Sequence, residues 1–311
     1  MSKPKRHSKI YENKHDEVNE FLQRKEDLGR SRSTLNEYSR NLREFFNDEF
    51  SEVEPADVEV RHIEEYLGIL SERDVAQNTK RRYLESLSSF FDYAMKRPRF
   101  NQITGNPVAP VLEELPKVNR SRPDCATWEN ACKIVHEIPS PRNRTIAAIL
   151  AKTGCRLQEA LEIELEDLLI DDGFIRLRVR KGGGQTVVPV DEEMVRAIER
   201  YKVIRTDYET AYLFPSNRGD RLSKQPIRKR IKEGAVEAGV MEQGEDRFHR
   251  KFTPHTFRTV FTTAMRNAGM SNHVLQYIRG DSDNQTMDIY TRVDRTTARE
   301  EYLDCIKSLN L

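Results

Sequence analysis

The chain has few cysteines, and they are poorly placed for a metal site. There are four in 311 residues, and none stands in a C-x-x-C pair. His136 lies near Cys132, but no second pair of ligands follows at the spacing of a zinc finger. We therefore expect reduced, buried thiols and no zinc site. No other metal or cofactor is expected either.

Long apolar runs are absent as well. No stretch approaches the ~20 apolar residues of a transmembrane helix, and none follows the N-terminus as a secretory signal would. This pattern predicts a soluble chain that stays inside the cell and makes no use of a membrane. A length of 311 residues suggests about two domains of ~150 residues, each able to bury a core.

The chain also has no large excess of positive or negative charge. The 52 Lys and Arg residues nearly balance 51 Asp and Glu residues, and the net charge is +1. A DNA-binding domain often has a pI above ~9, so the total argues mildly against a nucleic-acid partner. The total nevertheless hides separate clusters. Residues 1–10 hold four cations and no acid, and residues 218–232 hold seven cations and one acid, whereas residues 159–172 hold seven acids and no cation.

Clustered positive charge attracts a polyanion, although a solvated helix face is the alternative for any single cluster. Residues 1–13 predict a flexible basic arm that contacts phosphates, or else a disordered tail. Residues 110–124 lie in a polar stretch with several prolines and predict a linker between two domains.

Residues 14–109 predict a helical bundle. They contain hardly any glycine, and their apolar residues recur at helical spacing in four segments. Helix starts are expected near His15, near Ser33 or Thr34, after Pro55–Asp57, and at Asn78 or Thr79. The expected core positions are Val18, Phe21, Leu22, Leu35, Tyr38, Leu42, Phe45, Phe46, Val60, Ile63, Leu67, Leu70, Tyr83, Leu84, Leu87, Phe90, Phe91 and Ala94. Four amphipathic helices with short joints form a small bundle.

Residues 125–311 predict a second, mainly helical domain with one β-hairpin. Phe174–Arg180 alternates apolar and basic residues, which is typical of a half-buried strand with the arginines exposed. A glycine triplet forms the turn, with Lys181 at its edge, and Thr186–Val190 returns as the partner strand. Further helices are expected at 191–204, 224–238 and 296–309.

The stretch from Thr253 to Val293 combines a helix start with reactive side chains. Thr253 suits an N-cap and Pro254 the first helical position. His255 and Arg258 are three residues apart, so they share one face of a first turn that favours an anion. Tyr290 follows farther along the chain. A cationic pair with a downstream tyrosine suits phosphoryl chemistry with a protein nucleophile, but alone this pattern is weak.

Two earlier segments strengthen the pattern. In "TGCRLQEALEIELEDL", Gly154 ends one helix and Arg156 begins the next, and "FIRLRVRKGGGQTVVPV" carries Lys181. The order and spacing of five residues resemble those of the tyrosine recombinases, the phage-integrase family: Arg156, Lys181, His255, Arg258 and Tyr290. The match covers most of the chain. It is most specific around Arg156 and His255–Arg258, and looser in the N-terminal half, where "TLNEY" and "NTKRRYLESLSSFFDYA" carry it.

The resemblance implies an N-terminal helical core-binding domain and a C-terminal catalytic domain that together clamp double-stranded DNA at attachment sites. It implies that Tyr290 forms a 3′-phosphotyrosyl bond while Arg156 and Arg258 bind the non-bridging oxygens. It assigns Lys181 as the general acid and His255 as a proton-transfer or positioning partner, with no metal.

The family also implies an assembly and further DNA contacts. A homo-tetramer in the cytoplasm, at the nucleoid, would pair two sites, with the C-terminal helix docked on a neighbouring subunit. Packing of that helix on its own domain is the alternative. The candidate phosphate-contacting residues are Lys80, Arg81, Arg82, Arg176, Arg178, Arg180, Arg228, Lys229 and Arg230.

One position departs from the family pattern. Where the family usually has "LGH", with histidine or tryptophan last, this chain has "RGD", which places Asp281 there. A carboxylate accepts a hydrogen bond from an arginine or from Tyr290, but it donates none at neutral pH unless its pKa is raised. Arg279 is a candidate compensating cation. The "RGDS" form resembles integrases of haloarchaeal viruses and plasmids, although balanced charge does not suit a salt-adapted protein.

This departure leaves two alternatives beside the recombinase. One is a slow or inactive enzyme that serves as a DNA-binding regulator. The other, which shares the chemistry, is a relaxing enzyme similar to the type IB topoisomerases.

Overall fold

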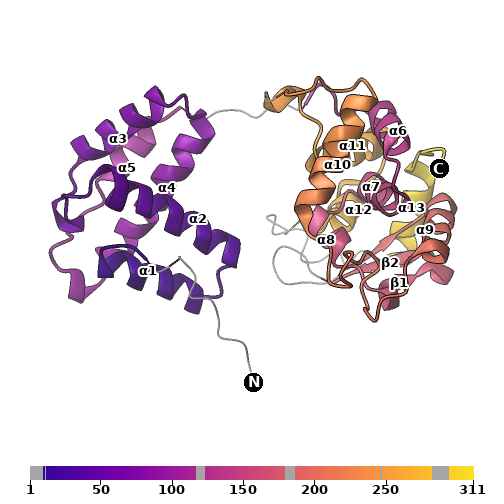
Figure 1. The fold of residues 1–311 in the computed structure, drawn as a ribbon, viewed down its shortest axis with the longest axis horizontal. Coiled ribbons are helices and arrows are strands. Elements are labelled where there is room, and N and C mark those ends of the chain that lie inside the picture. Colours follow the sequence, from indigo (N-terminus) through magenta and orange to yellow (C-terminus); the bar gives the residue numbers. More distant parts are fainter. Residues whose placement is uncertain (1–9, 11, 117–122, 179–185, 246, 282–293) are drawn as a thin grey trace. The chain divides into compact units, whose positions relative to one another are not determined.

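The computed structural model describes residues 10, 12–116, 123–178, 186–245, 247–281 and 294–311. The chain divides into two compact units, Met1–Arg120 and Ser121–Leu311, each with its own hydrophobic core (Figure 1). The predicted class is confirmed: both units are mainly helical, and the second contains one small antiparallel sheet. No described helix is long and apolar enough to cross a membrane.

The first unit is the predicted bundle. Its helices are α1 (Asp16–Asp27), α2 (Arg32–Arg43), α3 (Val60–Glu72), α4 (Gln77–Ala94) and α5 (Val108–Glu114), with a π-helical turn at Glu44–Glu49 and 3₁₀ turns at Pro55–Asp57 and Pro98–Phe100. Ser31 caps α2, because its hydroxyl accepts a hydrogen bond from the Thr34 N–H.

Aromatic side chains fill the core of the first unit. Phe45 and Phe46 meet edge to face at 5.0 Å, and Phe46 meets Phe90 in the same way at 5.5 Å. Such pairs stabilise a core by about 0.5–1.5 kcal/mol beyond the area that they bury. Most predicted core positions are buried, whereas Val60, at the start of α3, is 38% exposed.

Two predicted boundaries of this unit are wrong. Ile10 and Asn13 are buried, so the described end of the predicted basic arm belongs to the fold. Residues 110–115 were expected to be linker, but most of them form the rest of α5, and Val111 and Leu115 join the core. Each buried aliphatic side chain is worth roughly 1.5–3 kcal/mol, which explains why this segment folds onto the bundle. Pro110 is tolerated because it lies in the first turn of the helix.

The second unit surrounds a buried helix with a shell of helices and one sheet. Its helices are α6 (Trp128–Glu137), α7 (Pro141–Thr153), α8 (Leu157–Leu161), α9 (Glu192–Ile204), α10 (Lys224–Glu237), α11 (Pro254–Asn267), α12 (Asn272–Arg279) and α13 (Arg295–Cys305). Its strands are β1 (Leu168–Leu169), β2 (Phe174–Leu177) and β3 (Thr186–Pro189), in the order β1-β2-β3. The predicted hairpin is confirmed, with Ile175 opposite Val188.

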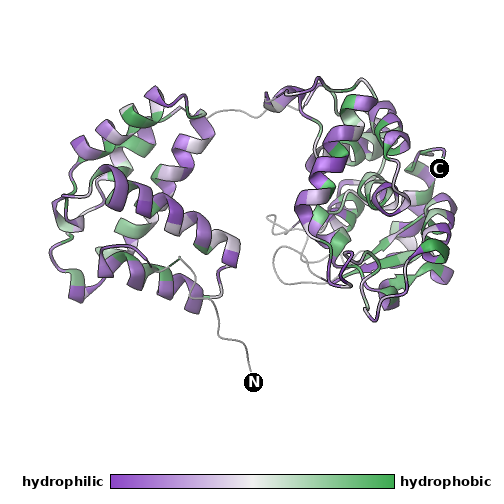
Figure 2. Ribbon diagram, viewed as in Figure 1, coloured by the Kyte–Doolittle hydropathy of each residue, from purple (hydrophilic) through white to green (hydrophobic). Residues whose placement is uncertain are grey.

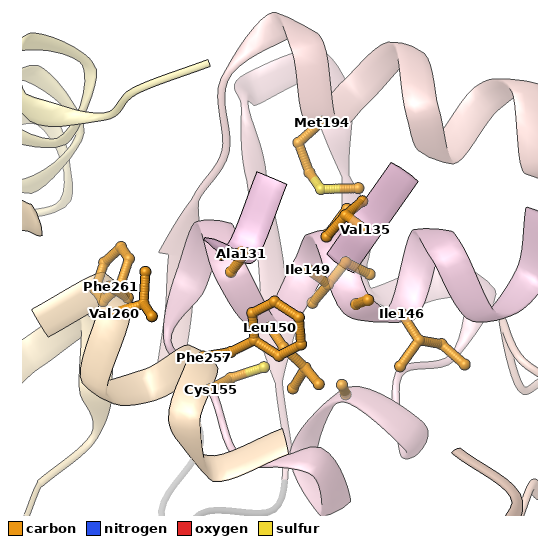
Figure 3. Packing of buried hydrophobic residues seen from close by; sticks show 14 of the residues in the cluster. Ala131, Val135, Ile146, Ile149, Leu150, Cys155, Met194, Phe257, Val260 and Phe261 are labelled. Carbon is orange, nitrogen blue, oxygen red and sulfur yellow. The ribbon is translucent and has the colours of Figure 1, made fainter. Parts of the chain in front are cut away.

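Helix α7 is the centre of this unit (Figure 1). It contacts α6, α8, α9, α10 and α11, and residues 145–153 are all buried. Ile146, Ile149 and Leu150 of α7 lie among side chains of α6, α9 and α11 (Figure 3). Helix α10, on the outside of this core, is mostly hydrophilic (Figure 2).

Gly154 fixes the end of α7 against α11. Its φ of +60° is a left-handed conformation that favours glycine, and a Cβ there would lie 2.5 Å from Cδ1 of Phe261. No other residue would allow both the turn and the close approach. The consequence is that Arg156, two residues on, lies beside the first turns of α11.

The C-terminal segment packs on its own unit. Ala298, Tyr302 and Leu309 are buried, whereas Leu303 is 38% exposed. The helix ends at Cys305 rather than at the predicted position 309. The residues after it are held by hydrogen bonds, because the indole N–H of Trp128 donates to the Ser308 carbonyl at 2.9 Å. In this structure the C-terminal helix therefore packs on its own domain, which was the alternative to docking on a neighbouring subunit.

Candidate active site

Arg156 is held at the start of α8 by a buried carboxylate. Its backbone N–H donates to Oε2 of Glu159 at 2.7 Å, and its Nη1 donates to Oε1 at 2.9 Å. The Glu159 side chain is almost fully buried, while that of Arg156 is 31% exposed. The ion pair with Glu159 therefore fixes Nη1 of the guanidinium and leaves Nη2 for a second partner.

Arg258 comes from the predicted helix start in α11. Thr253 is the N-cap residue and Pro254 the first helical residue, as predicted, and His255 is exposed on the first turn. Arg258 is only 4% exposed, and its Nη1 donates to the carbonyls of Gly154 at 2.7 Å and Arg279 at 2.9 Å. Burial lowers the pKa of Arg258 to about 10, so the group remains a cation at neutral pH.

Asp281 joins these two arginines and a third. Its Oδ1 accepts a hydrogen bond from Nη2 of Arg258 and lies 3.6 Å from Nη2 of Arg156. Its Oδ2 lies 3.1 Å from Nη2 of Arg279, whose pKa is lowered by burial. We call Arg156, Arg258, Arg279 and Asp281 the arginine cluster. Three segments that are far apart in the sequence thus bring their guanidinium groups to one carboxylate.

A cavity of about 550 Å³ lies next to the cluster. It is lined by Arg156, His255 and Arg258, and by three cations from one face of α10, at positions four residues apart: Lys224, Arg228 and Lys232. Lys251 adds a further cation, and no carboxylate occurs among the described residues that line the cavity. The cavity therefore offers an anion a strongly positive surface.

Other predicted site residues lie outside the described part of the chain. These are Lys181, Tyr290 and Arg180. Their roles remain predictions. Among the described residues, no group of three or more His, Cys, Asp or Glu side chains is arranged to hold a metal ion.

The three basic residues predicted as DNA contacts on α10 have different surroundings. Arg228 lines the cavity, whereas Lys229 and Arg230 are paired with Glu233 at 3.8 and 2.7 Å. Consecutive residues point to different sides of a helix, so one run cannot present all three to the same ligand. Lys224 and Lys232 were missed, although a search for cations spaced by four residues would have found them.

Arg176 and Arg178 are partly exposed, as the alternation along the strand predicted, but both are paired with acids. Arg178 forms ion pairs with Glu164 at 2.9 Å, with Glu166, and with Asp167 at 2.7 Å. Arg176 lies 3.5 Å from Asp167. The acidic segment 159–172 folds back along the strand, so clusters that are separate in sequence neutralise each other in space. Arg176 and Arg178 are poor phosphate-binding candidates for this reason.

In the first unit, the three candidate cations have different environments. Lys80 donates to the Ser71 hydroxyl at 2.8 Å. Arg81 donates to the Leu115 carbonyl at 2.6 Å and so closes the end of α5. Arg82 is exposed, which makes it the best placed of the three to contact a phosphate.

Both units match known families of domains. Residues 127–297 match the phage integrase family, and residues 9–99 match the N-terminal SAM-like domain of phage integrases. The chain belongs to the phage integrase family. This membership makes it a tyrosine recombinase, an enzyme that binds DNA and cleaves and rejoins its strands.

Individual relatives of this integrase support the same assignment over nearly the whole chain. It is 32% identical to tyrosine recombinase XerC of Thermodesulfovibrio yellowstonii, covering 88% of this chain and 90% of the relative. It is 29% identical to tyrosine recombinase XerD of Shewanella oneidensis with the same coverage. Its fold is similar to that of a lambda integrase tetramer bound to a Holliday junction, with TM-score 0.68, 19% identity, and coverage of 93% and 77% of the two chains.

Proposed function

We propose that this integrase is a site-specific recombinase in which Tyr290 attacks a DNA phosphodiester and Arg156 and Arg258 bind its non-bridging oxygens. The observation that carries the proposal is that these two arginines, from α8 and α11, line one cavity that has no carboxylate among its described lining residues. A guanidinium offers paired N–H donors to the oxygens of a phosphate.

Each step of the reaction has a residue assigned to it. The Tyr290 hydroxyl gives its proton to His255 or to solvent as its oxygen bonds to phosphorus, the bond to the 5′-oxygen breaks, and the leaving oxygen takes a proton from Lys181. His255, on the rim of the cavity, assists proton transfer or positions the phosphate. The buried cation at Arg258 stabilises the charge that develops on the phosphorus oxygens, because it is already oriented before DNA arrives. Attack by the freed 5′-hydroxyl reverses the step and rejoins the strand.

The cationic face of α10 extends the phosphate site. Lys224, Arg228 and Lys232 line the same cavity as Arg156 and Arg258. We assign them to the backbone phosphates next to the one that is cleaved, where they would add affinity rather than sequence recognition. Arg82 is assigned to the backbone on the side of the first unit.

We further propose a tetramer that pairs two DNA attachment sites. Exchange of the C-terminal segment within such a tetramer would first have to release its present contacts. The carboxylate of Glu193 accepts hydrogen bonds from the backbone N–H groups of Leu309 and Leu311 at 2.9 and 2.8 Å. An exchanged segment would make the same contacts with a neighbouring subunit.

Covalent trapping on nicked duplexes tests the chemistry and selects the target sequence in the same experiment. The full chain is incubated with a library of nicked duplexes whose core is randomised, and DNA that stays bound under denaturing conditions is sequenced. We expect a defined sequence to be enriched with the wild type and no adduct with Tyr290→Phe. The matched control is Tyr208→Phe, which removes only an exposed hydrogen bond to the Asn217 carbonyl and should form adduct like the wild type.

Other outcomes would point to the alternatives. A wild type that retains DNA under native conditions but forms no adduct is a DNA-binding regulator. Adducts formed equally with all sequences, together with relaxation of supercoiled plasmid, indicate a topoisomerase-like enzyme. An adduct that persists in Tyr290→Phe would remove Tyr290 from the mechanism.

A further inference from the structure

The end of α12 holds Arg258 at two points. Gly280 ends the helix in a left-handed conformation with φ +59°, and the N–H of Asp281 donates to the Gln276 carbonyl at 3.3 Å. The backbone at residues 279–281 is therefore fixed. From this position the Arg279 carbonyl and the Asp281 carboxylate both accept hydrogen bonds from the Arg258 guanidinium.

The two side chains that flank Gly280 have opposite charges and contact each other. Asp281 places one negative charge beside Arg156 and Arg258, which weakens the attraction of this pair for a phosphate. Arg279 places a positive charge 3.1 Å from the other oxygen of the same carboxylate and so offsets the negative charge of Asp281. The usual family sequence at these positions, Leu-Gly-His, carries neither charge when its histidine is neutral.

We propose that Arg279 and Asp281 form a coupled pair of positioning residues that replaces the leucine and histidine of the family pattern. The proposal rests on the proposed function. Asp281 orients Arg258 by accepting its hydrogen bond and attracts Arg156 through an ion pair at 3.6 Å, and Arg279 occupies the second oxygen and cancels the charge of the carboxylate. Neither residue touches the reacting atoms.

The geometry favours positioning over a carboxylate that blocks the phosphate site. Asp281 is not among the described residues that line the cavity, whereas Arg156 and Arg258 are. The carboxylate thus holds the two arginines from a side other than the one they present to the cavity. A blocking carboxylate would have to sit in the cavity and leave it when DNA binds.

Reversion to the family sequence tests the coupling. Four proteins are compared: wild type, Arg279→Leu, Asp281→His, and the double variant that restores Leu-Gly-His. The substrate is the nicked duplex that the wild type traps most efficiently. The rate constant of adduct formation at saturating duplex is measured separately from the Kd of the duplex.

We expect each single variant to lower the rate constant by about tenfold or more, because each leaves a charged partner unbalanced in a partly buried site. The double variant should be faster than either single variant, which is the mark of coupled residues. The Kd should change by less than about threefold, since the cations of α10 are untouched. The proposal would be overturned if the fold-decrease in rate constant of the double variant equalled the product of the two single decreases. An Asp281→His variant that is faster than the wild type would overturn it as well.

Controls separate this proposal from simpler explanations. Arg196→Leu with Glu192→His disrupts an exposed ion pair of α9 and should leave the rate constant unchanged. Arg279→Lys keeps the charge and should stay within about threefold of the wild type, whereas Arg279→Leu should not. If a leucine or histidine variant fails to fold, Arg279→Lys compared with Arg279→Gln carries the same test: equal rates for the two would overturn the pair.

The two proposals can fail separately. A wild type that forms no adduct with any duplex defeats the proposed function. A wild type that forms adduct, with single variants that are equally fast, defeats only the pair of Arg279 and Asp281.

Discussion

The catalytic unit contains two ionic clusters with opposite composition. In the arginine cluster, one carboxylate lies among three guanidinium groups. In the second, which we call the lysine cluster, Nζ of the fully buried Lys152 lies 2.5 Å from both Asp191 and Glu193. Lys152 also donates to the Lys307 carbonyl at 2.8 Å, and so ties the core to the C-terminal segment.

The clusters differ in how their excess charge is used. The excess acid of the lysine cluster is taken up by hydrogen bonds from the backbone, because Glu193 accepts from Leu309 and Leu311 and Asp191 from the Met194 N–H. The arginine cluster has more cations than acids, and two of these cations, Arg156 and Arg258, line a cavity that has no carboxylate among its described lining residues. A saturated cluster supports the fold, whereas a cluster with excess charge at a cavity is suited to a ligand.

The largest predicted effect is on the free energy of unfolding, and it comes from removing the buried cation of Lys152. This change should leave the rate of adduct formation unaffected. Lys152→Met leaves Asp191 and Glu193 facing each other without their partner, which should lower the free energy of unfolding by about 3–5 kcal/mol. Denaturant unfolding of the full chain measures this loss. The rate of adduct formation per folded molecule should remain that of the wild type, and a large fall in that rate would break the distinction between the two clusters.

Acid should weaken the lysine cluster in a definite pH range. Burial of Glu193 opposes its ionisation, but the hydrogen bonds from Lys152, Leu309 and Leu311 together lower its pKa from 4.5 to about 2. A lowered pKa stabilises the fold above the unfolded value, so this contribution is complete above pH 4.5 and is lost as the pH falls toward 2. Its size is about 3 kcal/mol.

Unfolding of Glu193→Gln tests this assignment. The variant should be less stable than the wild type at neutral pH, and the gap should narrow as the pH falls below 4.5. Glu192→Gln, which alters an exposed neighbour of Arg196, is the matched control and should follow the wild type throughout. A gap that stays constant with pH would show that Glu193 supports the C-terminal segment by packing alone.

Local patterns predicted much of the fold and part of the site. Helical spacing predicted the bundle and most helices of the catalytic unit, and the β-rich runs at Phe174–Arg180 and Thr186–Val190 predicted the two paired strands. Gly154 and the start of α11 at Pro254 were also readable, because each depends on residues within one or two turns. Arg156 and Arg258 became candidates through the resemblance to the phage-integrase family, because the pattern at the helix start is weak on its own.

Contacts between distant segments could not be predicted in this way. The hydrogen bond from Arg258 to Gly154 spans 104 positions in the sequence, and nothing local indicates it. The pairing of Arg178 with the acidic segment depends on how that segment folds back along β2. Composition treated these charges as separate clusters, whereas the fold makes them partners.

The smallest predicted effect concerns the cationic face of α10 and the salt dependence of DNA binding. Arg228 lines the cavity, whereas Arg230, two residues on, is paired with Glu233 at 2.7 Å. Arg228→Ala should reduce the dependence of log Kd on log salt by about one unit, because one phosphate contact is lost, and should weaken all sequences alike. Arg230→Ala is matched in residue type and helix and should leave this slope unchanged. Equal slopes for the two variants would mean that Arg228 contacts no phosphate. The positive surface of the cavity would then support the fold, as the lysine cluster does.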